Sequence, residues 1–381
     1  MSGLFKGKEQ SVAKPRYEIL DGLRGVAAVM VVWFHFFEAF ATSAVDQRIN
    51  HGYLAVDFFF VLSGFVLGYA YKDRWKEGLT AGRFMLRRII RLEPMVVFGA
   101  VLGAVSFVMS GCVKWDGSSV SVTAVVISLL CGIFMIPAWP GSVVDVRGYT
   151  EMFPLNGPSW SLFFEYIGSL LYATVLYRMS TKMLSFFVAL TGAALAATAF
   201  ADLSGTYHIG NGWSLAGWGS LMGFLRLAFS FSAGLLLSRV FRPRRINGAF
   251  WIAAIVIVAV MVCPYAGGSE PSVMNAVYDS VCSLIVFPAV VALGACGVTT
   301  DRWSTAVCGF VGRISYPLYI THYPVMYLFY AWVWKNNIPY ENALPVCALL
   351  FVGIVIIAWA AMRYYDEPVR RLLINRFRSR L

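Results

Sequence analysis

The sequence predicts an all-α protein that crosses a membrane many times. Of its 381 residues, 59% are hydrophobic and only 13% are charged, whereas soluble domains carry about 25% charged residues. Long apolar stretches follow one another along nearly the whole chain. Lys and Arg return between these stretches instead of gathering in one domain. The formal net charge of +11 therefore indicates membrane topology and not nucleic-acid binding.

Eleven apolar stretches are expected to be helical. A helix rises about 1.5 Å per residue, so roughly 20 apolar residues cross a hydrocarbon layer of about 30 Å. Gly and Pro within such stretches are compatible with membrane helices. No cleavable signal peptide is predicted, because the first apolar run is too long and no small-residue cleavage site follows it. The stretches cover residues 20–41, 53–71, 94–110, 121–138, 158–177, 184–201, 217–238, 249–264, 278–297, 310–334 and 343–362.

The positions of Lys and Arg favour ten crossings with both termini in the cytoplasm. Six basic segments hold 26 of the 31 Lys and Arg residues, and they share one side only if residues 94–138 make a single net crossing. The region 94–138 would then also contain a re-entrant or interfacial segment, and which part of it crosses stays open. We expect a membrane domain over residues 17–365 with polar basic tails at 1–16 and 366–381.

The seven cysteines predict neither a disulfide nor a metal site. Nearly all of them lie inside apolar stretches, with no CxxC pair and no zinc-like spacing to histidine. Motifs of several other enzyme classes are also absent: the sequence has no GxSxG elbow, P-loop, GxGxxG or HExxH.

Several ionisable residues fall inside the predicted spans, where such side chains are costly and are candidates for function. Arg24 and His35 are 11 residues apart, which is about 16 Å along a helix. With the predicted topology most of the group occupies the outer half of the membrane, which favours a shared site that water can reach. His51 and His208 fall in outer loops and receive no role. The residues placed in or near this layer are His35, Glu38, Asp57, Glu165 and Asp279, with Arg226 and His322 nearer the middle of the bilayer.

A second concentration of charge is the cytoplasmic segment GRFMLRRIIRLEP, with arginines at 83, 87, 88 and 91. Arg88 and Arg91 are three residues apart and share one helical face. Their guanidinium groups suit bidentate phosphate binding. Anchoring to anionic lipid headgroups is the alternative interpretation of the same cluster.

Five ordered segments resemble the integral-membrane acyltransferase 3 family, and the resemblance covers about residues 17–365. Members of that family O-acylate cell-envelope glycans and some other small or lipidic acceptors. The segments are LDGLRGVAAVMVVWFH (20–35), VDFFFVLSGF (56–65), RRIIRLEP (87–94), PSWSLFFEY (158–166) and ISYPLYITHYP (314–324).

The resemblance implies ten spans, an acyl-CoA donor supplied from the cytoplasm (acetyl-CoA most simply) and an acceptor modified at the outer side of a bacterial inner membrane. The family's Arg-x10-His pair matches Arg24 and His35, and its Arg-x-x-Arg pair matches Arg88 and Arg91. Two later motifs match with one conservative change, Ile320 for Leu. They fall on Trp160, Ser161 and Glu165, and on Tyr319 and His322.

The primary hypothesis is acyl transfer to a hydroxyl with His35 as general base. An acidic partner would fix the His35 tautomer, and Glu165 is ranked first, ahead of Asp57 and Glu38. One step and a covalent acyl-enzyme both stay open. The remaining roles are oxyanion donors at Trp160, Ser161, Tyr319 and His322, CoA phosphate binding at Arg87, Arg88 and Arg91, and a position for Arg24 between the two regions.

Other classes compete with this hypothesis. A transporter or flippase of a polar small molecule or lipid-linked sugar would also bury charges at mid-depth, and an inactive membrane scaffold is a third candidate. Structural roles compete as well: Trp160 as an interfacial anchor, Asp57 as a structural pair, and Arg226 as a buried ion pair. The acceptor, the acyl length and the oligomeric state are not determined by the sequence.

Overall fold

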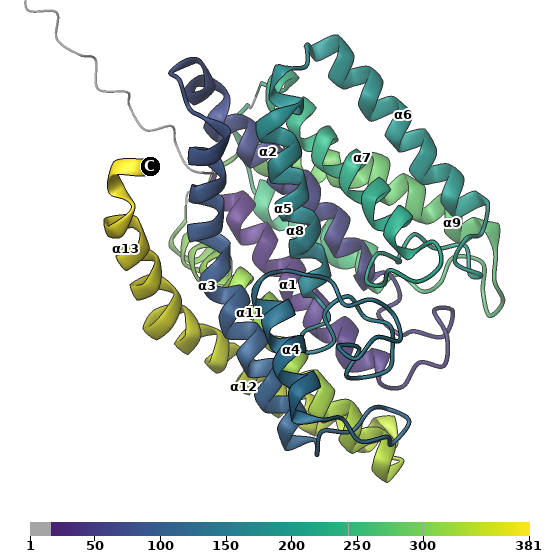
Figure 1. Ribbon diagram of the computed structural model, residues 1–381. Coiled ribbons are helices and arrows are strands. Elements are labelled where there is room, and N and C mark those ends of the chain that lie inside the picture. The colour runs from purple at the N-terminus through teal and green to yellow at the C-terminus, as the bar shows by residue number, and fades with distance from the viewer. Residues whose placement is uncertain (1–16, 243, 299–300) are drawn as a thin grey trace, which may run out of the picture.

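The structure is a computed structural model that describes residues 17–242, 244–298 and 301–381. The predicted tail 1–16 lies outside these ranges. Within them the chain forms a bundle of helices, with α12 and α13 along one flank (Figure 1). The helices are α1 (Glu18–Glu38), α2 (Ala55–Lys76), α3 (Ala81–Met109), α4 (Val122–Ile133), α5 (Ser159–Thr174), α6 (Thr181–Phe200), α7 (Gly219–Val240), α8 (Ala249–Val262), α9 (Val273–Val281), α10 (Phe287–Cys296), α11 (Arg302–Asn336), α12 (Tyr340–Ala361) and α13 (Glu367–Arg376).

Short elements complete the described chain. Two π-helical segments, Cys282–Val286 and Met362–Asp366, join α9 to α10 and α12 to α13. The strands β1 (Ile246–Asn247) and β2 (Gly297–Val298) pair in parallel over two residues each. Single 3₁₀ turns lie at Gly52–Leu54, Leu176–Arg178 and Arg378–Arg380.

All eleven predicted apolar stretches contain a helix in the described part of the chain, so the all-α membrane fold is confirmed at this level. By length and composition, seven helical segments within the described ranges are suited to crossing a bilayer: Glu18–Glu38, Gly52–Lys76, Ala81–Met109, Thr181–Phe200, Gly219–Val240, Val273–Cys296 and Tyr340–Arg376. The number of crossings and the side of the termini stay predictions. We call the end of the bundle that holds the C-terminal ends of α1 and α11 the outer end, following the predicted topology.

The region 94–138 contains one long and one short helix. α3 runs without a break for 29 residues from the arginine cluster to Met109, with Pro94 inside it. α4 has only 12 residues, about 18 Å of helix, which is shorter than the hydrocarbon layer. α3 is therefore the part of this region that is long enough to cross, and α4 has the length of an interfacial or re-entrant segment.

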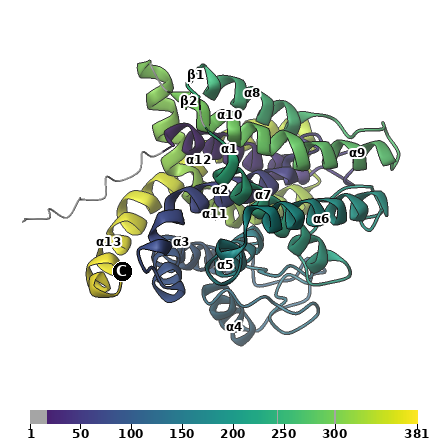
Figure 2. The same ribbon diagram turned by 90° about the horizontal axis from the view of Figure 1, so that it is seen from above.

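α1, α2 and α11 lie in the middle of the bundle, and α4, α6, α9 and α13 lie at its edge (Figure 2). The most extensive pairing joins α1 to α11, which run in the same direction. A Cβ atom on Gly25 would overlap the carbonyl of Val311, so glycine permits a close approach of the two backbones. Farther along, the Trp334 indole donates to the Ala39 carbonyl at 2.8 Å. This pairing brings the first and the last sequence motifs together.

α11 contains Pro317 and Pro324, and the second of these frees a backbone carbonyl next to the site. Pro324 has no backbone N–H, so the carbonyl of Ile320 loses its helical partner. The side-chain amide of Asn156 donates to that carbonyl at 3.0 Å. The loop before α5 is thereby attached to α11 within one turn of His322.

Candidate functional site

His35 forms a hydrogen-bonded pair with Glu38 at the outer end of α1. Its Nδ1 lies 2.7 Å from Glu38 Oε2. A carboxylate oxygen only accepts, so Nδ1 carries the proton and a neutral ring keeps its lone pair at Nε2. The Tyr330 hydroxyl lies 2.9 Å from the same carboxylate oxygen. The side chains of His35 and Glu38 are 16% and 41% exposed, so the pair is open on one side.

His322 lies against His35. The two ring centroids are 5.3 Å apart and the rings are nearly parallel, at 27°. His322 is fully buried, and its Nδ1 faces the Leu318 carbonyl at 3.2 Å. Its Nε2 has no hydrogen-bond partner among the residues that the structure describes. The ring of Tyr323 packs edge-on to His35, at 4.7 Å between centroids.

The acidic partner of His35 is Glu38, and not Glu165 or Asp57, which were ranked ahead of it. Glu165 contacts Arg88 and accepts from the Ser63 hydroxyl at 3.0 Å. Asp57 forms a fully buried ion pair with Arg226 at 2.7 Å. Neither carboxylate is the one that holds His35. Glu38 takes that place because residues three apart on a helix lie on the same face, within reach of each other.

Ser161 and Tyr319 form a second small group beside the histidines. Their hydroxyl oxygens are 2.7 Å apart, and the ring centroid of Tyr319 is 5.9 Å from that of His322. Trp160 lies elsewhere. It is 7% exposed, and its ring centroid is 5.4 Å from the guanidinium carbon of Arg226. A buried position is not that of an interfacial anchor.

The arginines of the predicted donor region differ in whether protein groups accept their hydrogen bonds or their side chains are exposed. Arg88 is buried, with Nε donating to Ser169 Oγ at 3.1 Å in addition to its ion pair with Glu165. Arg91, one turn farther along, is exposed. Arg87 donates to the carbonyl of Leu381. Arg24 donates to Ser315 Oγ at 2.8 Å and pairs with Asp21 at 3.1 Å, so it also joins α1 to α11.

The loop between α4 and α5 covers the tyrosine side of this site. The Tyr327 hydroxyl donates to Glu151 Oε2 at 2.8 Å, and the guanidinium carbon of Arg147 lies 3.4 Å from the Tyr327 ring centroid. Burial raises the pKa of the Glu151 carboxyl to about 8. A Cβ on Gly157 would lie 2.7 Å from the Tyr323 ring, so the loop backbone rests directly on the residue that packs against His35.

Three tyrosines of α11 contribute to the site although no role was predicted for them. Tyr323, Tyr327 and Tyr330 follow one another at spacings of four and three, which places them on one helical face. Tyr330 reaches the carboxylate of Glu38, and Tyr327 reaches that of Glu151. The spacing was a signal that could have identified this face.

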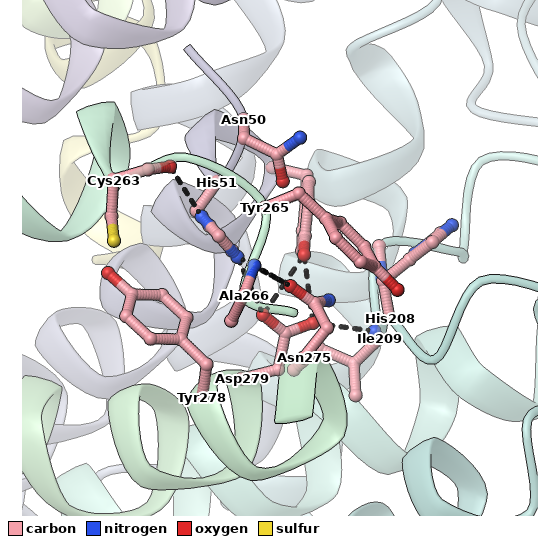
Figure 3. Close-up of polar contacts among 12 residues, drawn as sticks. Asn50, His51, His208, Ile209, Cys263, Tyr265, Ala266, Asn275, Tyr278 and Asp279 are labelled. Atoms are coloured by element: carbon pink, nitrogen blue, oxygen red, sulfur yellow. Dashed lines mark hydrogen bonds and ion pairs between the residues drawn. The ribbon is translucent and has the colours of Figure 1, made fainter. Parts of the chain in front are cut away.

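A separate polar cluster forms where the outer loops meet (Figure 3). Both ring nitrogens of His51 have partners, the Cys263 carbonyl and Asn275 Oδ1, each at 2.9 Å. Asp279 Oδ2 accepts from the Tyr53 hydroxyl at 2.9 Å and from the Ile209 amide at 2.9 Å. The side chains of His51 and Asp279 are completely buried. This arrangement attaches loops to α9 and gives both His51 ring nitrogens protein partners, although the neighbouring Asn50 Oδ1 has no partner among the described residues.

The described residues include no group of three or more His, Cys, Asp or Glu side chains that could hold a metal ion.

Comparison with known proteins agrees with the sequence motifs. A family model described as an acyltransferase domain matches residues 17–363. The putative membrane-bound transacylase BcsY of Komagataeibacter xylinus is 24% identical over 88% of this chain and 86% of that protein. Protein 2 in the picA locus of Rhizobium radiobacter is 32% identical over 47% of this chain and 93% of that protein.

A third relative, acyltransferase MdmB of Streptomyces mycarofaciens, is 29% identical over 44% of this chain and 41% of that protein. No solved structure matches the fold significantly. The family model covers most of the residues, including every motif discussed above. The chain therefore belongs to the acyltransferase 3 family of multi-pass membrane proteins.

Proposed function

We propose that this protein transfers an acyl group, most simply acetyl, from cytoplasmic acyl-CoA to a hydroxyl of a glycan or lipid-linked sugar outside a bacterial inner membrane. The observation that carries the proposal is the His35–Glu38 pair, partly open to solvent and packed against His322. Family membership supports acyl transfer, and the name of the relative BcsY, a membrane-bound transacylase, agrees with it.

His35 acts as the general base. Its Nε2 takes the proton of the acceptor hydroxyl as the oxygen attacks the acyl carbon. Glu38 holds the proton on Nδ1 and stabilises the imidazolium that forms, and Tyr330 orients Glu38 from the facing helix. A positioned base of this kind accelerates a reaction by roughly 10²–10⁴-fold.

Ser161 and Tyr319 are the best-placed donors to the oxygen that becomes negative in the transition state. Their hydroxyls are adjacent, and they lie on the side of His322. Trp160, Asp57 and Arg226 take a structural role in this proposal, because Asp57 and Trp160 both contact the Arg226 guanidinium.

Arg91 holds phosphate groups of the donor at the cytoplasmic end of α3. It is the exposed member of the arginine pair, and guanidinium groups bind phosphate strongly. Arg88 supports this region through its ion pair with Glu165, and Arg24 and Arg87 lie beside it in the proposed donor path. Lipid anchoring remains the alternative for this cluster.

The proposal is tested with His35→Ala and His35→Gln in cells that carry equal membrane amounts of each protein. Mass spectrometry of envelope polysaccharides and lipids measures the acylated product, and free thiol release from acetyl-CoA measures donor use. We expect product to fall at least a hundredfold in both variants. His208→Gln is the matched control and retains wild-type turnover per folded molecule.

Turnover retained in both His35 variants would refute the base assignment. A wild-type protein that never consumes acyl-CoA, yet moves a lipid-linked sugar, would establish the transporter alternative instead.

A further inference from the structure

The unpartnered nitrogen of His322 is the starting point. Buried polar atoms almost always have a hydrogen-bond partner, because an unpaired one costs free energy. His322 Nε2 is buried and has no partner in the described part of the chain. It is one of ten such side-chain atoms in the described residues, and it belongs to the ring that stacks on His35. A substrate atom that takes the place of a protein partner accounts for an unpartnered atom at this position.

The proton on His322 can be assigned from its other nitrogen. The Leu318 carbonyl, 3.2 Å from Nδ1, only accepts hydrogen bonds. Nδ1 therefore donates, and the neutral ring presents a lone pair at Nε2. A lone pair does not stabilise an oxyanion, so the donor role expected for His322 from the sequence does not fit this geometry. A nucleophile fits it.

The two adjacent imidazoles differ in what lies behind them. Behind His35 Nδ1 is the carboxylate of Glu38, which stabilises a proton gained at Nε2. Behind His322 Nδ1 is an uncharged carbonyl, and the ring is fully buried. His35 is thus equipped as a base, and His322 as a neutral nucleophile protected from water.

We propose, building on the function proposed above, that His322 carries the acyl group between donor and acceptor. Its Nε2 attacks the thioester carbon, the N–C bond forms, the C–S bond breaks, and CoA leaves as the thiolate with the electron pair. The acyl-imidazolium carries the matching positive charge.

In the second step the acceptor hydroxyl attacks the same carbon. Its proton passes to His35 Nε2, the bond to His322 Nε2 breaks, and His322 returns to the neutral imidazole. His35 then releases the proton to water at the exposed side of the pair. The sum of the two steps is thioester plus alcohol giving ester, thiolate and a proton, so the balance closes.

The surroundings of His322 suit such a short-lived cation. The ring centroids of Tyr319 and Tyr323 lie 5.9 and 5.8 Å from that of His322, at interplanar angles of 52° and 77°, so two electron-rich rings pack against it. Complete burial of the ring keeps water away from an acyl-imidazolium, which water would hydrolyse. A relay also lets donor and acceptor react in turn, so both need not occupy the site together.

The test uses purified full-length protein in detergent with acetyl-CoA alone and no acceptor. We expect a burst of about one free thiol per wild-type molecule, followed by slow release. His35→Ala should keep the burst and lose turnover with an envelope extract. His322→Ala should lose both the burst and turnover.

His322→Gln separates a carrier from a residue that only accepts a hydrogen bond. Its amide oxygen can accept but cannot take an acyl group, so we expect no burst and at least a hundredfold less turnover. It also serves if His322→Ala does not fold, as judged by gel filtration and thermal melting.

Three outcomes overturn the relay. They are a burst that persists in the His322 variants, more than a tenth of turnover in His322→Gln, and turnover with envelope extract in a wild-type protein without a burst. The last result would leave the proposed function intact and make the transfer a single step. A wild-type protein with neither burst nor turnover would refute the proposed function itself.

Discussion

Two histidine–carboxylate clusters lie toward the predicted outer side, and they are built from the same residue types. In the first, His35 pairs with Glu38, whose carboxylate accepts from the Tyr330 hydroxyl. In the second, His51 Nε2 lies 3.7 Å from Asp279, whose carboxylate accepts from the Tyr53 hydroxyl. The first pair is 16% and 41% exposed, whereas the second is completely buried.

The difference is in what each cluster leaves unsatisfied. Both ring nitrogens of His51 have protein partners, and Asp279 accepts from a hydroxyl and an amide (Figure 3). In the other cluster, the neighbouring His322 has a nitrogen with no partner among the described residues. A closed network stabilises loops, whereas an open one has capacity left for a substrate. Residue type alone does not separate these two roles.

The largest effect expected from this comparison concerns the two carboxylates. Glu38→Gln should lower acyl transfer roughly a hundredfold or more at unchanged abundance, because an amide neither holds the His35 tautomer as well nor stabilises the imidazolium. Asp279→Asn should instead lower stability, on the order of 2 kcal/mol, by weakening a buried network. Turnover per folded molecule and thermal melting in detergent measure the two effects.

Each variant is the control of the other. The assignment of Glu38 to activity and Asp279 to stability would be wrong in either of two cases. In the first, Glu38→Gln lowers the melting temperature and keeps normal turnover. In the second, Asp279→Asn keeps wild-type stability and loses turnover.

The same distinction between satisfied and open groups predicts different effects for Arg88, which is ion-paired, and Arg91, which is exposed. Arg91→Ala should raise the KM for acetyl-CoA about tenfold with little change in kcat, because an exposed charge–phosphate contact contributes about 1.4 kcal/mol or more. Arg88→Ala should lower abundance, because it leaves the partly buried Glu165 carboxylate, 22% exposed, without its ion-pair partner. The exposed Arg83→Ala on the same helix is the control. An unchanged KM in Arg91→Ala would return this residue to lipid anchoring.

The smallest effect concerns the buried cluster around Glu151. Burial raises its pKa from 4.5 to about 8, so the folded protein holds this proton more tightly than the unfolded chain does. Stability from this group is therefore full at low pH and falls as the pH rises from about 5 to 9. Glu151→Gln should remove that fall, changing the pH dependence of the melting temperature by on the order of 5 °C.

Melting curves at several pH values measure this difference, with the exposed Glu270→Gln as control. An identical pH dependence in Glu151→Gln and the wild type would show that Glu151 does not titrate in this range.

Much of the fold was predictable because a bilayer constrains sequence locally. The positions of the apolar stretches follow from helix length and hydrophobicity, and the structure has a helix in every one of them. The shortness of α4 was harder to foresee, since its apolar stretch merges with the loop that follows it. The motifs around His35 and His322 were also recognisable in the sequence and lie together.

The partner of His35 was not predictable by depth. Glu38, Asp57 and Glu165 were all expected in the outer half of the membrane, but depth does not define lateral distance. Asp57 and Glu165 are occupied by arginines of other helices, Arg226 and Arg88. The predicted depth in the membrane was therefore compatible with three carboxylates, and the packing of the helices leaves only Glu38 in contact with His35.

The sequence by itself determined that this chain is a helical membrane protein of an acyltransferase family, because composition, apolar length and ordered motifs are all properties of local segments. Only the tertiary structure decided which polar groups meet. The close approach of α1 and α11 at Gly25 sets how the helices are rotated against each other. That packing places His322 beside His35, whereas the His51 cluster is satisfied by partners from the loops and α9.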